Sequence, residues 1–385
     1  TIFRAEIGNE NEATQRQVRD YFARIYKTEV DGKEYIKETS LDFCRKQKIK
    51  ESMLKCVPLL EKLSFDEISK EINNALILGS DNNFGHDYLI DFEERFKIKT
   101  RNPISTGWTA IDDICKSGLG KGELGVVIAP TGAGKSMVLV HLGSQAIKNG
   151  KTVVHYTLEL GDTVVASRYD SCITGYPLSD LHTFKDSIYE TVKNLPGKLI
   201  IKEYPTKSAS TKTIRNHLEK LRKRGNEPGL VIVDYGDLLR PISMQREKRN
   251  ELESIYEEMR AIAQEFKCPI WTASQTNRSG LNAEVITMES ISEAFNKCFV
   301  ADFIFSVSRT IDDKTANSGR IFVAKNRNGP DGIIYPIFMD TSNVKIKVLP
   351  SNGDTPASVI ENSAKEEAKS LREKYKKYKK DRKNK

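Results

Sequence analysis

The 385-residue chain lacks long hydrophobic runs, and its few cysteines and histidines are scattered. No stretch approaches the ~18 apolar residues of a transmembrane helix. The chain begins at Thr1 with neither Met nor the basic and apolar segments of a signal peptide, so we expect a fragment of a soluble protein. Six cysteines without a C-x-x-C pair and five histidines without ligand spacing indicate reduced thiols, a cytoplasmic compartment and no zinc.

The net charge of +8 is concentrated at one end of the chain. Residues 365–385 hold eleven Lys or Arg against four Asp or Glu, a net +7 that leaves +1 for the rest. A nearly neutral body has no domain-wide basic field, so its contacts with nucleic acid must come from local loops. The Lys-rich composition predicts a partly disordered tail over 351–385 that binds nucleic acid or an acidic partner.

The most informative stretch is a loop of small residues between an apolar run at 124–128 and a helical pattern at 137–149. Small residues let successive backbone N–H groups point at phosphates, and the following helix adds the positive end of its dipole. In this pattern Lys135 reaches the β- and γ-phosphates of ATP, and the Ser136 hydroxyl binds Mg²⁺. The alternative is a turn with a chance lysine. The predicted nucleotide-binding residues are Ala129, Pro130, Thr131, Gly132, Ala133, Gly134, Lys135 and Ser136.

Apolar runs alternate with helical patterns along most of the chain, which predicts an α/β fold with a mostly parallel sheet. In such a sheet, ligands bind at the carboxyl ends of the strands. Two carboxylates are expected there. Glu159 is a candidate base that polarises an attacking water, although a solvated glutamate is the alternative; Asp234 is a candidate magnesium ligand. We expect strands at 124–128, 153–159, 199–202, 230–235, 269–274, 302–307, 320–324 and 333–338, and helices at 137–149, 162–174, 179–193, 211–224 and 251–266.

Further polar side chains follow two other predicted strands. Gln275 can touch the γ-phosphate and lead into a long loop, 279–297, so it can report ATP hydrolysis. A strand-capping amide without a role in the site explains it as well. Lys325 and Arg327 alternate before a Gly-Pro turn and can project together as two cations suited to a phosphate. A charge pair that protects an edge strand from aggregation is the equal alternative.

The first hundred residues show helical patterns without chemistry. We expect a partial helical N-terminal region at 1–62, with helices at 15–26 and 41–63, and a linker helix with a connector at 63–100. The linker helix begins at the capping box of Ser64 and Glu67. Its pattern alone favours packing on its own core over a neighbouring subunit. An apolar stripe in the N-terminal region is expected to pack on a partner helix and comprises Phe43, Ile49, Met53, Leu54 and Val57.

From about 102 to 348 the chain resembles the hexameric DnaB-type replicative helicases, which have a RecA-like ATPase core, and most of all those of T-even-like phages. The resemblance rests on an ordered set of motifs, which is more specific than any one of them. The core motifs begin at Ser105, Ala129, Thr157, Val233, Ser274 and Ala324. The phage-type features begin at Phe84, Phe92 and Ile201. The resemblance implies that 101–350 is the helicase ATPase domain, preceded by a truncated helical region and the linker helix.

Residue roles follow from the resemblance position by position. It implies that Lys135, Ser136 and Asp234 hold MgATP, that Glu159 is the catalytic carboxylate and that Gln275 couples the site to DNA. It also implies that Lys325 and Arg327 enter the neighbouring subunit's site as a cationic finger on the γ-phosphate, so hydrolysis requires a ring. The linker helix then docks on the next subunit, which reverses the preference drawn from its pattern.

The predicted DNA-binding loop departs from the family pattern. Relatives often bind single-stranded DNA through a loop containing Arg-Glu-Ser-Gly, and the corresponding stretch here is 292–297, in which the basic residue has moved. We assign DNA contact to backbone N–H groups around the loop and to its lysine. The predicted DNA-binding residues are Glu293, Ala294, Asn296 and Lys297.

The resulting hypothesis is a phage replicative helicase that acts in the host bacterial cytoplasm. It predicts a homo-hexameric ring on single-stranded DNA, with primase and a helicase loader as further partners. Two rivals stay open: a RecA-like recombinase that forms filaments, and a non-unwinding ATP-dependent clamp or loader. Glu159 argues against the clamp, since a clamp without turnover needs no catalytic carboxylate.

Overall fold

The structure is a computed structural model that describes residues 33–61, 64–65, 67–68, 71–72, 88–89, 92–93, 101–243, 247–276, 283–286, 299–355, 358–359 and 361. The chain divides into two compact units. The first comprises 1–98 with 222–225, and the second comprises 99–221 with 226–385. Among the described residues, no helix is both long enough and apolar enough to cross a bilayer.

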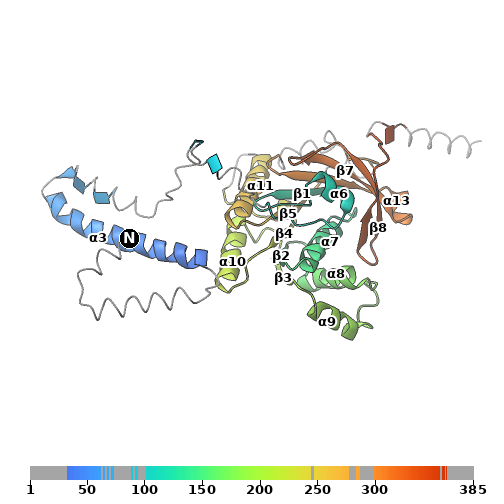
Figure 1. Cartoon of the computed structure of the whole chain (residues 1–385), viewed down its shortest axis with the longest axis horizontal. Helices are drawn as coiled ribbons and strands as arrows, with labels where there is room; N and C mark the ends of the chain where they lie inside the picture. The colour runs from blue at the N-terminus through green and yellow to red at the C-terminus, as the bar shows by residue number, and fades with distance from the viewer. Residues whose placement is uncertain are drawn as a thin grey trace, which may run out of the picture. The chain divides into compact units, whose positions relative to one another are not determined.

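The second unit is built on one nine-stranded sheet (Figure 1). The strand order is β3-β2-β4-β5-β1-β6-β7-β8-β9, so the chain crosses over repeatedly to place β1 near the middle. The first six strands in this order run parallel, and the pairs from β6 to β9 are antiparallel. The strands are β1 (Leu124–Ala129), β2 (Thr152–Thr157), β3 (Lys198–Glu203), β4 (Leu230–Asp234), β5 (Ile270–Gln275), β6 (Phe303–Ser308), β7 (Ser318–Asn326), β8 (Ile334–Asp340) and β9 (Lys345–Val348).

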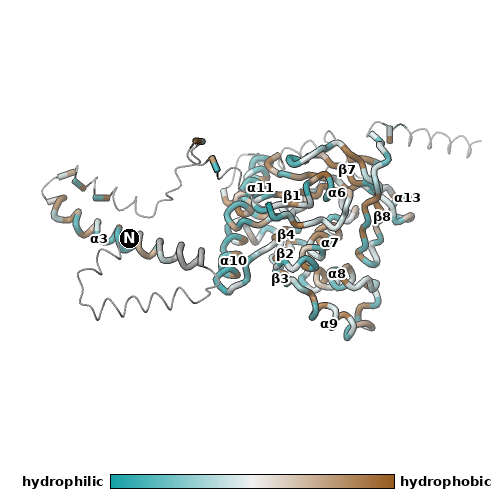
Figure 2. Tube along the Cα trace, in the orientation of Figure 1, coloured by the Kyte–Doolittle hydropathy of each residue, from teal (hydrophilic) through white to brown (hydrophobic). Residues whose placement is uncertain are grey.

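Helices cover both faces of this sheet because its central strands are apolar on both sides. Alternate residues of β1 enter two different cores: Val126 packs in the layer under α10 and α11, and Val127 packs in the layer under α6, α7 and α8. Apolar residues accordingly concentrate along the strands in Figure 2. The helices of this unit are α6 (Thr109–Ile114), α7 (Lys135–Lys148), α8 (Asp162–Thr174), α9 (Lys185–Lys193), α10 (Thr211–Lys223), α11 (Lys248–Glu265) and α13 (Ile311–Thr315).

The α/β fold with a mostly parallel sheet is confirmed, with small changes at the ends of elements. Strand β2 ends at Thr157, two residues before the predicted end, and α9 begins six residues later than predicted. Short elements α6, α13 and β9 were not predicted. They have four to six residues each, too few for a periodic pattern to show.

In the first unit, α3 (Lys33–Glu61) is a 29-residue helix. The expected packing of its apolar stripe on a partner helix stays a prediction. Phe43, Met53, Leu54 and Val57 are between 58% and 66% exposed, so the described residues do not cover them. The linker segment is helical at the described positions 65, 67–68 and 71–72, and Lys55 of α3 forms an ion pair with Glu71 at 3.3 Å. The predicted helix at 15–26 lies outside the described residues.

Candidate nucleotide site

The loop between β1 and α7 has the backbone that a phosphate cradle needs. Gly132 and Gly134 have φ angles of 74° and 101°, in the left-handed region that disfavours side chains. A Cβ on Gly134 would also lie 2.0 Å from Cε of Met339, so the end of that side chain would have to move. The loop leads directly into the first turn of the 14-residue helix α7. Its free N–H groups and dipole therefore face the same space as the loop.

Lys135 is 9% exposed and lies under the loop. Its Nζ donates to the carbonyl oxygens of Ala129 and Pro130, both at 3.3 Å, and lies 5.6 Å from the ring centroid of Tyr235. Burial lowers the pKa of the ammonium, while the negative charge of Glu159 opposes this shift. Two main-chain carbonyls are weak partners for a buried cation, so the arrangement favours an anion beside Lys135.

Asp234 ends β4 and is 2% exposed. Burial raises the pKa of its carboxyl to about 6, against a hydrogen bond from Ser136 that lowers it. Among the described residues, its buried Oδ1 has no hydrogen-bond partner. In the register of β2 and β4, Asp234 is opposite Thr157, which precedes Glu159 by two residues. Adjacent strand ends thus bring both predicted carboxylates to one edge of the sheet.

Gln275 ends β5, the strand that pairs with β1. Its Nε2 donates to Oγ1 of Thr131 at 2.7 Å, and its Oε1 accepts from the Tyr235 hydroxyl at 3.3 Å. Its backbone N–H donates to the Asp237 carboxylate at 3.3 Å. The amide therefore bridges the phosphate loop and the segment after β4, which is more than capping a strand requires.

A cleft of about 250 Å³ joins these groups. It is the size of a small-ligand site at the carboxyl ends of parallel strands, where such folds bind ligands. Glu159 is exposed and lines it, so its carboxylate is open to a ligand or a water. The lining residues are Thr131, Gly132, Gly134, Lys135, Ser136, Met137, Glu159, Leu160, Arg168, Gln275 and Thr341.

Four lining residues were not predicted, of which two are polar, Arg168 and Thr341. Arg168 lies on α8; burial lowers the pKa of its guanidinium, while the charges of Asp234 and Glu159 oppose the shift. It thus supplies a second cation beside the two carboxylates. A lone arginine inside an ordinary helical pattern gives no sequence signal. Thr341 follows β8 and reaches the cleft only through the sheet topology.

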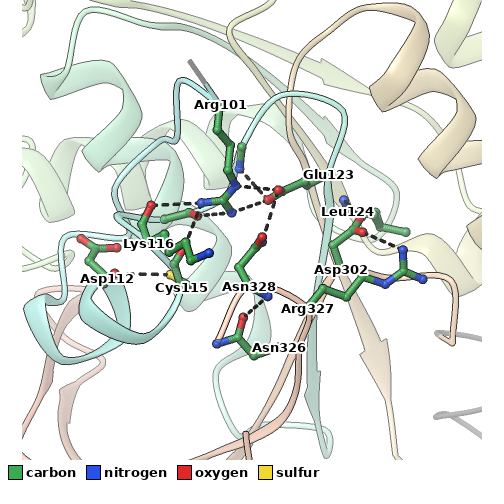
Figure 3. A network of polar contacts seen from close by, with 12 residues as sticks. Arg101, Asp112, Cys115, Lys116, Glu123, Leu124, Asp302, Asn326, Arg327 and Asn328 are labelled. Atoms are coloured by element: carbon green, nitrogen blue, oxygen red, sulfur yellow. Dashed lines mark hydrogen bonds and ion pairs between the residues drawn. The ribbon is translucent and has the colours of Figure 1, made fainter. Parts of the chain in front are cut away.

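Lys325 and Arg327 lie in a different place, at the end of the sheet where β1 begins. Figure 3 shows Arg327 beside Asp302 and Leu124. Arg327 donates through Nη1 to Oδ1 of Asp302 at 3.2 Å, and Oδ2 of Asp302 accepts from the N–H of Leu124 at 3.0 Å. Lys325 donates to the carbonyl of Phe299 at 2.5 Å and lies 4.5 Å from that ring's centroid. Strand β7 lies between β6 and β8 in the sheet, but its register with β8 ends at Phe322, before Lys325. The edge-strand explanation of the two cations therefore stays an alternative.

The two sites are separated by the length of β1. Leu124 begins the strand and Ala129 ends it at the phosphate loop. Five steps of ~3.3 Å place these ends ~17 Å apart, further than an arginine side chain extends. Neither Lys325 nor Arg327 can therefore reach the cleft of its own chain. The predicted DNA-binding residues Glu293, Ala294, Asn296 and Lys297 lie outside the described residues.

Comparison with known proteins gives a match to the family described as DnaB-like helicase C terminal domain, over residues 103–344. The DnaB-like replicative helicase of Enterobacteria phage T4 is 28% identical over 272 residues, which cover 67% of this chain and 57% of that protein. The replicative DNA helicase DnaB of Mycoplasma genitalium is 27% identical over 303 residues, 70% of this chain and 63% of that protein. The chain thus spans less than two thirds of the length of these relatives.

Among solved structures, a DnaB-like replicative helicase described with its interactions with primase has a TM-score of 0.56 at 16% identity. The match covers 81% of this chain and 78% of that one. At this identity the likeness supports the fold alone. It agrees with the sheet and helices described above.

Proposed function

The chain belongs to the family of DnaB-like helicase C-terminal domains, and from that premise we propose that it is an ATP-driven replicative DNA helicase. It translocates on single-stranded DNA and unwinds the duplex as a homo-hexameric ring. The observation that carries the proposal is the convergence of the phosphate loop, Glu159 and Gln275 on one cleft, with Asp234 at the end of β4, which pairs with β2. These groups come from four strand ends that are up to 150 residues apart in the sequence.

The residues at the cleft fit a magnesium ion. A buried carboxylate oxygen of Asp234 without a partner, next to the Ser136 hydroxyl, is the hard oxygen set that this ion prefers. Ser136 and Asp234 would hold the ion, which when bound neutralises phosphate charge. The loop N–H groups and Lys135 hold the β- and γ-phosphates, so Lys135 exchanges two carbonyl partners for an anion.

Glu159 and Gln275 have separate roles in the proposed reaction. Glu159 accepts a hydrogen bond from the attacking water and draws a proton from it as the bond from the water oxygen to the γ-phosphorus forms. The bond from the γ-phosphorus to the β–γ bridging oxygen breaks, and that oxygen leaves with ADP. Gln275 contacts Thr131 of the loop and begins the segment that leads toward 277–298. A change at the γ-phosphate alters this contact, and the strand end transmits it to the DNA-binding loop. We propose that this loop binds DNA through Glu293, Ala294, Asn296 and Lys297.

The catalytic site is completed by a second subunit. Lys325 and Arg327 cannot reach their own cleft, and both keep solvent-accessible cationic groups. In the proposed ring they enter the neighbour's cleft and stabilise charge on the transferred phosphoryl group. Lys325, Arg327, Lys135 and Glu159 then act on the reacting groups, and Gln275 completes the catalytic set as the residue that couples the site to DNA. The helix at 64–78 docks on the next subunit and holds the ring together.

Partners and compartment extend the proposal. The solved relative is described with primase, and we propose primase and a helicase loader as partners of this chain as well. The protein would act in the cytoplasm of a phage-infected bacterium, in line with the phage relative.

The test is unwinding of a forked duplex together with ATPase activity with and without single-stranded DNA, across protein concentration. We expect DNA-stimulated turnover that rises as rings assemble and that Lys135→Ala abolishes. The control is Lys198→Ala, an exposed lysine on β3. Unwinding that survives Lys135→Ala would reject the site. ATP-dependent filaments with strand exchange would instead indicate a recombinase, and binding without turnover would indicate a clamp.

A further inference from the structure

We propose that Asp302 is a positioning residue for Arg327: its buried carboxylate holds one terminal nitrogen of the guanidinium and thereby directs the rest of the group toward the neighbouring subunit's phosphate. The inference rests on the proposed action of Arg327 across the subunit interface. It assigns a function to a carboxylate that no motif identifies.

Asp302 is fixed more firmly than a surface ion pair requires. Its side chain is 6% exposed, and both of its oxygens are used. Arg260 of α11 donates to both, at 3.1 Å through Nε and 3.0 Å through Nη2. The N–H of Leu124 donates to Oδ2 at 3.0 Å, which ties the carboxylate to the first residue of β1. The anchor for Arg327 is thus itself held by a helix and by the central strand.

Arg327 is held on one side and open on the other. Its backbone N–H donates to the Asp302 carbonyl at 3.0 Å, and only its Nη1 contacts the carboxylate. The side chain stays 44% exposed, so donors on the other edge of the guanidinium remain available (Figure 3). Lys325 is close enough that the charge of Arg327 contributes to lowering its pKa, after burial. Arg327 and Arg260 thus contact one carboxylate, and the charge of that carboxylate also acts on Lys325. Three cations beside one carboxylate leave a net positive site for a polyphosphate.

The end of β7, directly before Arg327, has two features that fix the position of Arg327. The register between β6 and β7 shifts between Ile304 and Phe305, a bulge that re-aims the residues that follow it on β7. Asn326 is 7% exposed and donates to the carbonyls of Ile114 and Pro330. Asn326 is the last residue of β7, so these two bonds fix the strand end directly before Arg327.

Such an anchor matters because an arginine loses side-chain freedom when it binds. A guanidinium already held in its working orientation loses less freedom in the transition state and can be placed to within a fraction of an ångström. The contact to Asp302 persists while the open edge binds the phosphate. Loss of the anchor should lower kcat and leave KM for ATP nearly unchanged, because the finger contacts the transferred group chiefly in the transition state.

The test uses mixed rings. A Lys135→Ala chain has no working cleft but still donates its finger, and an Arg327→Ala chain has a cleft but no finger. Mixing them should restore single-stranded-DNA-stimulated ATPase activity. Asp302→Asn is then added to one chain at a time. We expect it to lower the restored kcat about 10- to 100-fold in the Lys135→Ala donor, and to have little effect in the Arg327→Ala acceptor, where no finger remains to be held.

The outcomes separate the two proposals. No restoration by the parent mixture would overturn the trans action of Arg327. If Asp302→Asn lowers the restored ATPase activity equally in the donor and in the acceptor, or lowers it in neither chain, the positioning role is overturned. The action of Arg327 in trans is then still supported. A loss confined to the donor supports it.

A second variant covers the case in which Asp302→Asn does not fold. Arg260→Gln removes two hydrogen bonds to Asp302 without changing the carboxylate, and it should give a smaller, donor-only loss. Glu265→Gln, which breaks the exposed pair with Arg215 at 2.8 Å, is the matched carboxylate-to-amide control and should affect neither chain. A donor loss as large for Glu265→Gln as for Asp302→Asn would count against the proposal.

Discussion

The two ends of the central sheet contrast in how their charged groups are satisfied. At the phosphate-loop end, within the part of the chain that the structure describes, Lys135 has only main-chain carbonyls as hydrogen-bond acceptors, and a buried oxygen of Asp234 lacks a partner. At the other end, Asp302 uses both oxygens and is surrounded by cations. The first end is incomplete without a ligand. At the second end the charged groups are paired within the chain, except for the guanidinium donors of Arg327 that do not contact Asp302.

This difference indicates two half-sites rather than one active site. The cleft supplies the loop, the proposed water-activating carboxylate and the proposed metal ligands, whereas the opposite end supplies preformed cations. The length of β1 keeps them apart within one chain. Only a neighbouring copy can bring a phosphate and Arg327 together, and this is why we propose that turnover requires assembly.

The largest expected effect comes from removing the cation that crosses between subunits. Arg327→Ala should lower kcat for ATP about 10³-fold or more, because the charge of the transferred group loses its guanidinium. Nucleotide affinity should change little, since the cleft of each chain is intact. Steady-state ATPase assays combined with equilibrium binding of a fluorescent nucleotide measure both. If nucleotide affinity falls as much as kcat, the two ends of the sheet do not have the separate roles that we propose.

Removing the proposed water-activating carboxylate should have the next largest effect. Glu159→Gln keeps the size of the side chain but not its basicity, so we expect a 10²- to 10³-fold lower kcat, on the order typical of general-base loss. Single-turnover hydrolysis isolates the chemical step. Activity within about threefold of wild type would support the solvated-glutamate interpretation.

A third effect concerns stability without ligand. Burial raises the Asp234 pKa from 3.8 to about 6, so the folded state binds this proton more tightly than the unfolded state. The contribution of the protonated Asp234 carboxyl to the free energy of unfolding is therefore lost as pH rises from about 4 to about 6. A pKa difference of about 2 corresponds to about 3 kcal/mol of this free energy. In chelator, Asp234→Asn should unfold at higher denaturant than wild type at pH 7.5, with the difference vanishing near pH 4.

The effect of MgATP on stability provides a second test of the role of Asp234. With MgATP, wild type should gain stability and Asp234→Asn should gain little, because the amide cannot serve as the anionic ligand. Denaturant unfolding at both pH values with and without MgATP gives all the required differences. A variant that is less stable than wild type in chelator at pH 7.5 would show that the carboxylate is satisfied without a ligand.

The smallest expected effect is on the coupling between ATP hydrolysis and single-stranded DNA. Gln275→Ala removes the contact to Thr131 and leaves the phosphate loop and carboxylates in place. We expect basal ATPase activity within a few-fold of wild type and about a tenfold smaller stimulation by single-stranded DNA, about 1.4 kcal/mol of coupling. Equal losses of basal and stimulated rates would assign Gln275 to chemistry instead.

Local sequence patterns predicted the features that depend on residues close together in the sequence, such as strand ends and the phosphate loop. Four apolar residues before Asp234 placed it at a buried strand end, and the glycines placed Lys135 and Ser136 under a phosphate loop. Arg168 was not predictable, because only the packing of α8 brings it to the cleft. The role of Asp302 depends on Arg260 and Arg327, 42 and 25 residues away. No pattern within a single strand or helix encodes such a contact.

The most direct test of the central claim is a structure of the assembled protein with a non-hydrolysable MgATP analogue and single-stranded DNA. The two half-sites predict that Arg327 of one subunit lies within hydrogen-bonding distance of the γ-phosphate held by Lys135 of its neighbour, with the Asp302 contact retained. Arg327 remote from every bound nucleotide, in rings that hydrolyse ATP, would contradict the account.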